Sequence, residues 1–247
     1  MPVQLQPAYV LHHRPYRETS RILELFTRDF GRVSVFARGA RGGRKSAASL
    51  MSMLQPFNRL LVSWSGRGEA GQLTGAEFDG AVCALPPDRL VSGFYLNELL
   101  LKLFARHDAH PEVFDLYDHT IETLKQRTEV LPDLRIFEKR LLELLGYGLA
   151  LDRDITGHAI EPQASYHFRV EQGLVRAHDV AEGALIFPGS SLLALAREDL
   201  SDRNACADAR RLLRAALDRV LEGRDLKTRE VMLALRAANR LGDDDRG

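Results

Sequence analysis

Residues 25–46 read LFTRDFGRVSVFARGARGGRKS, and this stretch decides how the first third of the chain is interpreted. Across the run Arg32–Phe36, Val33 and Val35 alternate with polar or larger residues, which is the period of a strand that buries one face. The Asp-Phe-Gly segment before the run is typical of a turn. The stretch therefore predicts a strand between a turn and a glycine-rich, basic loop.

Four further runs of this kind lie on either side of it in the chain. They are rich in Val, Ile, Leu, Phe or Trp, and Arg-Pro, Gly-rich and Ser-Gly segments separate them. These runs are Ala8–His12, Arg21–Phe26, Arg59–Trp64 and Gln72–Phe78. Together with Arg32–Phe36, they predict a small β-barrel in residues 1–82.

After the break at residues 85–87, which read LPP, the pattern becomes helical. Asp88 is expected to cap the first helix, in which Phe94 and the neighbouring apolar residues face inward. Three amphipathic segments follow one another, and their apolar faces can bury each other. The expected helices are Arg89 to about His107, a second that begins at Pro111, and a third that follows Pro132 and stops at Gly146.

The segment Leu149–Phe187 interrupts the helical patterns with several Gly and Pro residues. Within it, residues 165–177 read SYHFRVEQGLVRA and predict a β-hairpin with its turn near Gly173. Helical patterns then resume at about Ser191–Arg197, Asn204–Leu221 and Thr228–Arg240. We therefore expect an α+β protein with two domains. They are a barrel in residues 1–82 and a mainly α-helical domain in residues 83–247, with the hairpin insertion at about 149–187.

The chain of 247 residues is neutral overall, with 34 Lys and Arg against 34 Asp and Glu, but its cations are unevenly distributed. In the first 67 residues, 11 basic residues face only three acidic ones, which are Glu18, Glu24 and Asp29. Such an excess at one end predicts contact with a polyanion.

The two cysteines, Cys83 and Cys206, are far apart and have no C-x-x-C spacing. They indicate neither a disulfide framework nor a thiolate zinc site, and a reducing cytoplasm fits them best. The start of the chain lacks the apolar core of a signal peptide, and the most apolar run, LNELLLKLF, is short and interrupted by charges. We therefore expect a cytoplasmic protein with no membrane span.

The octet GARGGRKS, Gly39–Ser46, differs at one position from the phosphate-binding consensus G-x-x-x-x-G-K-[ST]. Lys45 and Ser46 are in place, but Arg44 stands where the motif requires its second glycine. Glycine there lets the backbone approach the phosphates closely, and the motif normally belongs to a βαβ unit rather than to a run of short strands. A nucleotide-binding enzyme is therefore kept only as an alternative.

The same loop suits the backbone of a nucleic acid, because its glycines let several cations follow an irregular phosphate chain. Other arginines add charge if the barrel brings their loops to the same side. The expected cations are Arg14, Arg17, Arg38, Arg41, Arg44, Lys45 and Arg67. Three aromatic side chains either stack bases or pack in the core. They are Tyr16, Phe36 and Trp64.

Six segments, taken in order and spacing, resemble the bacterial recombination mediator RecO. They are AYVLHHRPYRETS, LFTRDFGRVSVFARGARGGRKS, LQPF, FYLNELLLKLF, LLGYG and LKTRE, and they extend from residue 8 to residue 230. The resemblance implies an N-terminal OB-fold barrel followed by a helical domain. It also implies that the LKTR residues, 226–229, match an LKSR-like motif of the family. We include Lys227 and Arg229 among the DNA-binding candidates, with the alternative that Lys227 simply opens the last helix.

The resemblance further implies a non-enzymatic role in DNA repair and recombination, in the RecF pathway. Members bind single- and double-stranded DNA and anneal complementary strands. They contact the C-terminal tail of the single-stranded DNA-binding protein and act with RecR to load RecA, which would bring a cytoplasmic protein to the nucleoid during repair. A helical scaffold protein without a direct DNA role is the other alternative.

Many members of the RecO family carry four zinc-binding cysteines in the insertion, which would begin near Asp154 here, but Leu149–Phe187 contains no cysteine. We therefore expect no zinc, and we expect apolar packing to hold the hairpin instead. The packing residues would be Tyr166, Phe168, Val170, Leu174 and Val175. The histidines have no metal-binding spacing and no nucleophile-and-base signature is present, so we expect neither a catalytic site nor a cofactor.

Overall fold

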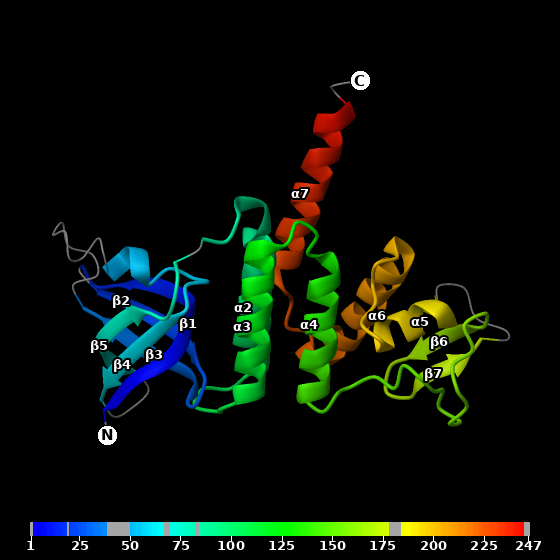
Figure 1. Ribbon diagram of the computed structural model, residues 1–247, viewed down its shortest axis with the longest axis horizontal. Helices are drawn as coiled ribbons and strands as arrows, with labels where there is room; N and C mark the ends of the chain where they lie inside the picture. Colours follow the sequence, from blue (N-terminus) through cyan, green and yellow to red (C-terminus); the bar gives the residue numbers. More distant parts are fainter. Residues whose placement is uncertain are drawn as a thin grey trace. The chain divides into compact units, whose positions relative to one another are not determined.

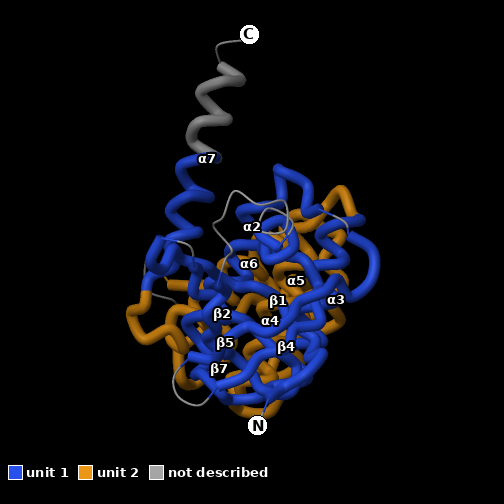
Figure 2. The backbone as a smooth tube through the Cα atoms, turned by 90° about the vertical axis from the view of Figure 1, so that its left-hand side faces the viewer, with its two compact units in different colours: residues 1–126, 225–247 blue, residues 127–224 orange. Residues whose placement is uncertain are grey.

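A computed structural model of the chain describes residues 2–18, 20–38, 50–66, 70–82, 84–177 and 184–244, with side chains up to residue 235. Contacts divide the chain into two compact units (Figure 2). The first unit contains residues 1–126 and 225–247, and the second contains residues 127–224. The sequence predicted a domain boundary near residue 82, where the strands end and the helices begin. The contacts instead place residues 83–126 and 225–247, which contain the first helices and the last one, in the same unit as the strands.

A closed five-stranded barrel opens the first unit, in agreement with the predicted OB-like fold. The strand order is β1-β2-β3-β5-β4, and β4 closes the barrel by pairing with β1 (Figure 1). All pairs are antiparallel except β3 with β5. The strands are β1 (Val3–Tyr16), β2 (Ser20–Thr27), β3 (Gly31–Ala37), β4 (Leu60–Ser65) and β5 (Gly71–Phe78), so all five predicted runs are confirmed.

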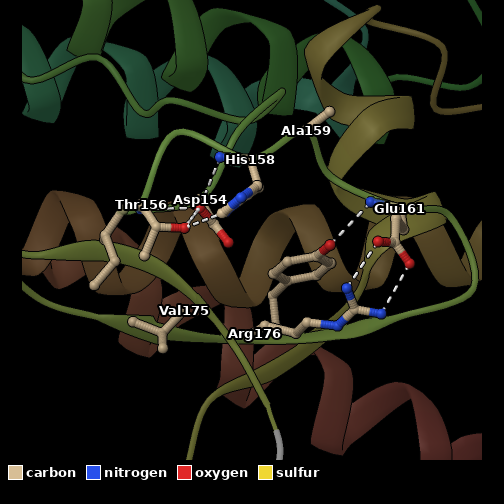
Figure 3. Close-up of a pocket in the computed structure, with 9 residues that line it drawn as sticks. Asp154, Thr156, His158, Ala159, Glu161, Val175 and Arg176 are labelled. Atoms are coloured by element: carbon tan, nitrogen blue, oxygen red, sulfur yellow. Dashed lines mark hydrogen bonds and ion pairs between the residues drawn. The ribbon is translucent and has the colours of Figure 1, made fainter.

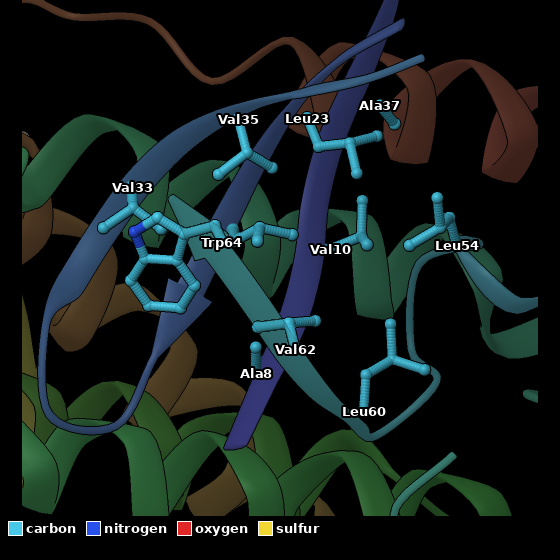
Figure 4. Packing of buried hydrophobic residues seen from close by; sticks show 11 residues of the cluster. Ala8, Val10, Leu23, Val33, Val35, Ala37, Leu54, Leu60, Val62 and Trp64 are labelled. Carbon is cyan, nitrogen blue, oxygen red and sulfur yellow. The ribbon is translucent and has the colours of Figure 1, made fainter. Parts of the chain in front are cut away.

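The barrel interior is filled by alternate residues of the strands (Figure 4). Val33 and Val35 of β3 are in this core, as their alternation predicted, and they pack with Leu23 and Leu25 of β2. The other buried members are Ala8, Val10, Ala37, Leu54, Leu60, Val62 and Trp64. Because side chains alternate between faces, the intervening residues of these strands point outward.

Two helices contact the outside of the barrel. They are α2 (Leu90–Leu103), which follows the 3-10 turn η1 (Pro87–Arg89), and α3 (Pro111–Gln126). The rings of Tyr9 and Tyr117 lie 5.0 Å apart, edge to face. The Tyr117 hydroxyl donates to Asn97 Oδ1 at 2.6 Å, and Asn97 Nδ2 donates to the Leu11 carbonyl at 2.9 Å. The outer face of the barrel and the helices therefore pack together around buried aromatic rings and a buried hydrogen-bond chain.

The first helix differs from its prediction at both ends. Asp88 does not cap it: the N-cap is Arg89, without a side-chain hydrogen bond. The helix ends at Leu103 rather than near His107, because Arg32 of β3 donates to the carbonyls of residues 101 and 104 at 2.6 Å each. The outward-facing Phe94 is 43% exposed and was wrongly expected to be buried, although its edge contacts Phe57 at a ring distance of 5.1 Å.

The last helix, α7 (Lys227–Asp244), begins against α2. The Glu98 carboxylate, only 15% exposed, accepts hydrogen bonds from Lys227 N and Thr228 N at 2.9 Å and from Thr228 Oγ1 at 2.7 Å. Burial alone raises the pKa of Glu98, but these hydrogen bonds outweigh it and hold the pKa below its ordinary value. Buried Leu226 completes the attachment.

Replacing Glu98 by glutamine is expected to lower the free energy of unfolding by about 1–2 kcal/mol at pH 7, because charge-assisted hydrogen bonds to the helix N-terminus become neutral ones. The wild-type stabilisation is complete above about pH 4.3, the ordinary pKa of glutamate, and is lost as the pH falls through the lower folded value. The penalty should therefore shrink in acid. Urea unfolding at pH 7 and at pH 3.5 measures it, with exposed Glu77→Gln on β5 as the matched control. A penalty equal to that of the control would contradict the assignment.

The second unit combines three helices with a small sheet of order β7-β6-β8. Its elements are α4 (Leu131–Leu144), β6 (Ser165–Arg169), β7 (Gly173–Arg176), β8 (Ile186–Pro188), α5 (Gly189–Ala196) and α6 (Arg203–Leu221). Strands β6 and β7 form the predicted hairpin, which is confirmed, and β8 is a third strand that the sequence did not indicate. Asp202 caps α6 by accepting from Ala205 N at 2.8 Å.

Apolar packing holds the hairpin at three of the five expected positions. Tyr166, Phe168 and Leu174 are buried, and Val175 is partly buried. The expectation is wrong for Val170, which is 47% exposed, because it lies in the turn between β6 and β7 and not on the packed face.

Candidate nucleic-acid interface

One outer face of the barrel brings together several of the predicted basic and aromatic residues. Arg14 of β1 is paired with Ile22 of β2, and Ile22 is paired with Phe36 of β3. Residues paired across strands share a face. This face is the outer one, because the neighbouring positions Leu23 and Val35 belong to the barrel core. Arg14 and Phe36 therefore lie on the same outer surface.

Two aromatic rings form the centre of this surface. The rings of Tyr16 and Phe36 are 5.1 Å apart and inclined at 47°, and both side chains are half-buried. The guanidinium carbon of exposed Arg17 lies 5.2 Å from the centre of the Tyr16 ring, within the range of a cation–π contact. Exposed Arg38 directly follows β3. We name these residues the basic–aromatic patch; its members are Arg14, Tyr16, Arg17, Phe36 and Arg38.

The arginines of the patch differ from Arg28 and Arg59 of the barrel in their electrostatic surroundings. In the described parts of the chain, Arg14, Arg17 and Arg38 have no carboxylate within 4 Å. Arg28 and Arg59, in contrast, are neutralised by carboxylates of α3 and of the residue after β5. The ion pairs are Arg28 with Asp115 at 2.9 Å, and Arg59 with Asp118 at 2.6 Å and with Asp79 at 2.7 Å. The patch therefore holds cations that are free to meet an anion.

Four predicted cations, and the octet that resembles a nucleotide cradle, cannot be placed. Arg41, Arg44, Lys45 and Arg67 lie outside the residues that the structure describes, as does Gly39–Ser46. Arg38, which immediately precedes Gly39, is described. The chain therefore enters this basic segment directly from the patch.

Trp64 does not form part of the interface. Its side chain belongs to the barrel core with 9% of the residue exposed, and Phe30 contacts it edge to face at a ring distance of 5.4 Å. In β4, Leu60, Val62 and Trp64 are alternate residues that all point inward. The indole is therefore covered by protein side chains, and stacking on Trp64 is set aside.

Lys227 and Arg229 come from a different part of the first unit. They lie in the first turn of α7, which contacts α2, whereas the patch is built from β1, β3 and the residues directly after these strands. The Lys227 side chain is exposed, and its backbone N–H serves the cap by Glu98. This geometry agrees with a residue that opens the last helix, and a DNA contact by either residue stays a prediction.

Arg21 and His13 belong to the same end of the barrel and were missed by the sequence analysis. Arg21 Nη1 lies 3.0 Å from His13 Nδ1. Burial in the first place, and then the charges of Arg21 and His12, lower the pKa of His13. Arg21 is paired with Pro15 of β1 and with Ala37 of β3. Only an alignment of all three strands could therefore have shown that Arg21 and His13 lie close to the patch.

The second unit contains an open pocket of about 400 Å³ beside the hairpin (Figure 3). Its polar groups satisfy one another: Asp154 Oδ1 accepts from Thr156 N at 2.9 Å, from Thr156 Oγ1 at 2.6 Å and from His158 N at 3.1 Å. Glu161 and Arg176 form a bidentate pair at 2.7 and 2.8 Å. The hydrogen bond from the Thr156 hydroxyl, and to a smaller extent those from the backbone N–H groups, lower the pKa of Asp154. Hydrogen bonds thus organise this loop.

Over the described ranges, no group of three or more His, Cys, Asp or Glu side chains is arranged to hold a metal ion. Within the same ranges, no helix is both long enough and apolar enough to cross a membrane.

Comparison with known families identifies the chain. Residues 1–80 match the family model for the recombination protein O N terminal, and residues 86–230 match the model for the recombination protein O C terminal. The chain belongs to the RecO family. The two matched regions are separated by residues 81–85, between the end of β5 and η1. The N-terminal model covers the barrel, and the C-terminal model covers the small sheet and the helices from α2 to the first turn of α7.

Relatives in the RecO family are similar over nearly their whole length. A DNA repair protein RecO from Alkalilimnicola ehrlichii is 46% identical over 229 residues, which cover 92% of this chain and 90% of the relative. RecO from Nitrosococcus oceani is 43% identical over 247 residues, or 100% of this chain and 98% of the relative. RecO from Dechloromonas aromatica is 43% identical over 240 residues, with 94% and 96% covered. The predicted resemblance is confirmed, and RecO membership supports a role in DNA repair and recombination.

Proposed function

We propose that the chain is a DNA-binding recombination mediator that binds DNA through the basic–aromatic patch and the basic loop after it. The observation that carries the proposal is the grouping of three arginines without carboxylate partners, among the described residues, around the ring pair Tyr16–Phe36. Arg41, Arg44, Lys45 and Arg67 are proposed to extend this cationic surface.

Binding by such a surface is driven by the release of counterions that condense on the phosphate backbone. Contacts to phosphates carry no information about base sequence, so both single- and double-stranded DNA should bind almost independently of sequence. Annealing requires two polyanions to approach each other. Fixed arginines reduce that repulsion, and the patch is the proposed place where two complementary strands meet.

The aromatic pair adds a contact that only an unpaired base can make. A base that stacks on an aromatic side chain contributes about 1–3 kcal/mol. The rings of Tyr16 and Phe36 are half-buried and therefore held in place, while each keeps part of its surface open. We propose that one or two bases of a single strand stack there.

Membership of the RecO family also supports proposals about partners. The chain would contact the C-terminal tail of the single-stranded DNA-binding protein and act with RecR to help load RecA on coated DNA. Fluorescence titration with a tail peptide and with purified RecR would measure the first two contacts.

The central test is the salt dependence of DNA binding. For about five engaged phosphates, the logarithm of the affinity for a single strand should fall against the logarithm of salt concentration with a slope of about −3.5. Fluorescence anisotropy with labelled oligonucleotides measures the slope. A chain that fails to bind DNA is instead a scaffold, and ATP binding at Gly39–Ser46 without DNA binding would favour the nucleotide-binding alternative.

Alanine at both Tyr16 and Phe36 is expected to weaken single-strand binding by about 5- to 160-fold, which corresponds to the loss of about 1–3 kcal/mol of stacking. Duplex binding should change less, because paired bases do not reach the rings. Anisotropy titrations with single and double strands of one sequence measure both effects. The control is Tyr147→Ala, which removes an exposed ring from the second unit. Equal losses for both DNA forms would argue against stacking.

A further inference from the structure

The inner side of the barrel end that carries the patch holds an arginine and a histidine. Arg21 of β2 is paired with Pro15 of β1 and with Ala37 of β3. Ala37 belongs to the core, so Arg21 faces the same side as the core. Pro15 lies between two members of the patch, and so does Ala37. Arg21 therefore occupies the inner face of the strand ends whose outer face is the basic–aromatic patch.

His13 shares this inner position. It is paired with the core residue Leu23, two residues along β2 from Arg21. Arg21 Nη1 lies 3.0 Å from His13 Nδ1 and 3.3 Å from His13 Nε2. Both side chains are partly buried at the rim, so a ligand on the surface can reach them.

Arg21 has more hydrogen-bonding capacity than the described residues satisfy. Its Nε is buried and has no hydrogen-bond partner among them, and no carboxylate of the described chain lies within 4 Å of its guanidinium group. A buried charged donor without a partner is costly, and natural structures normally complete it with an anion or with water. The neighbouring free cations Arg14 and Arg38 raise the local positive potential further.

We propose that Arg21 and His13 form an anion subsite that takes one phosphodiester group of the strand bound at the basic–aromatic patch. The inference rests on the proposed DNA binding of that patch and adds two residues to it. The guanidinium of Arg21 supplies a forked pair of donors that matches phosphate oxygens. His13, once protonated, supplies a second donor on the other side of the phosphate. The strand thereby continues from the outer face over the rim of the barrel.

The subsite couples phosphate binding to a proton. Burial is the largest cause that lowers the pKa of His13. The charges of Arg21 on β2 and of His12 on the same strand lower it further. His13 is therefore largely neutral in the free protein at pH 7. A bound phosphate offsets the charge of Arg21 and raises the pKa of His13. Since the bound state has the higher pKa, binding takes up a proton and the affinity rises as the pH falls through that value.

The subsite can be tested first without DNA. Histidine ring resonances of the whole protein are followed by NMR from pH 5 to 8, at constant ionic strength, with sodium phosphate or with sodium chloride, and His13→Asn assigns the signal. Inorganic phosphate is expected to raise the pKa of His13. A His13 titration curve that is identical in the two salts would show a purely structural Arg21–His13 contact and overturn the proposal.

The second arm uses DNA. Between pH 7.5 and 6.0, the single-strand affinity of the wild type should rise about three- to tenfold, within the limit of tenfold per pH unit for one proton. His13→Asn should flatten this rise, and His12→Asn should keep it. Arg21→Gln should weaken binding about three- to tenfold at pH 7, as loss of a phosphate contact does, while Arg21→Lys retains part of it. Circular dichroism checks that each variant is folded.

The outcomes distinguish a failure of the anion subsite from a failure of the proposed DNA binding. If the wild type does not bind DNA, the proposed function fails together with this inference. If the wild type binds DNA but His13→Asn keeps the full pH dependence and Arg21→Gln keeps the full affinity, the patch stands and the subsite is wrong. The subsite is established if inorganic phosphate raises the pKa of His13, His13→Asn flattens the pH dependence of DNA binding, and Arg21→Gln weakens DNA binding.

Discussion

Replacing Arg38, Arg41, Arg44 and Lys45 together by alanine is expected to weaken single-strand DNA binding about 100-fold or more at 0.1 M salt. Each phosphate contact contributes about 0.7 to the slope of log affinity against log salt, so the loss of four contacts should flatten the slope by about 2.8. The helical circular dichroism signal should not change, because none of these cations lies in a described helix. Anisotropy titrations from 50 to 300 mM salt measure affinity and slope together.

A matched variant separates position from net charge. Alanine at Arg127, Arg153, Arg169 and Arg197 removes the same charge from exposed sites of the second unit. It should lower the affinity only slightly. If both quadruple variants lose affinity equally, binding depends on overall charge and the interface has no defined location. If the loop variant keeps the wild-type slope, the loop does not contact phosphates.

Gly31→Ala is expected to have the largest effect on stability, about 3 kcal/mol or more, or to prevent folding. The glycine has a φ of +62°, a left-handed conformation that costs an alanine about 1–2 kcal/mol. An added Cβ would also lie 1.9 Å from the carbonyl oxygen of Asp108, in the segment between α2 and α3. Backbone atoms cannot rotate away, so β3 and this segment would have to separate. Urea unfolding measures the loss.

Gly80→Ala provides the control that separates backbone conformation from contact. Gly80 also has a positive φ, +96°, but a Cβ there meets no atom within 4 Å. It should therefore show only the conformational cost. Equal destabilisation by the two substitutions would mean that the close approach of Gly31 to Asp108 does not contribute to stability.

The arginines of the barrel illustrate what a sequence pattern cannot resolve. Arg14 and Arg28 look alike in the chain, because each follows a predicted strand in the basic end. Asp115, 87 positions after Arg28, neutralises Arg28 only because α3 packs against the barrel. No carboxylate of the described residues reaches Arg14. The set of free cations is therefore a property of the tertiary structure.

The aromatic candidates show the same limit. Phe36 and Trp64 are both strand residues with similar flanking patterns, and the sequence left stacking and core packing open for each. Barrel closure places Trp64 inside, whereas Phe36 contacts Tyr16 on the outer face. Which face of a strand points inward depends on all of its neighbours in the sheet, and the pairing of β3 with β5 joins residues that are 36 positions apart.

The sequence by itself determined the five strands, the succession of helices, the hairpin of the insertion and membership of the RecO family. The strands, helices and hairpin follow from periodicity and turn residues, which are local and survive without knowledge of distant contacts. The family membership follows from the resemblance carried by six segments of the chain. Only the tertiary structure decided where α2 ends, which arginines remain without partners, that Trp64 is buried, and that Arg21 meets His13 beside the patch. Each of these depends on a contact between strands or helices, and such contacts exist only after the chain has closed the barrel and packed its helices on it.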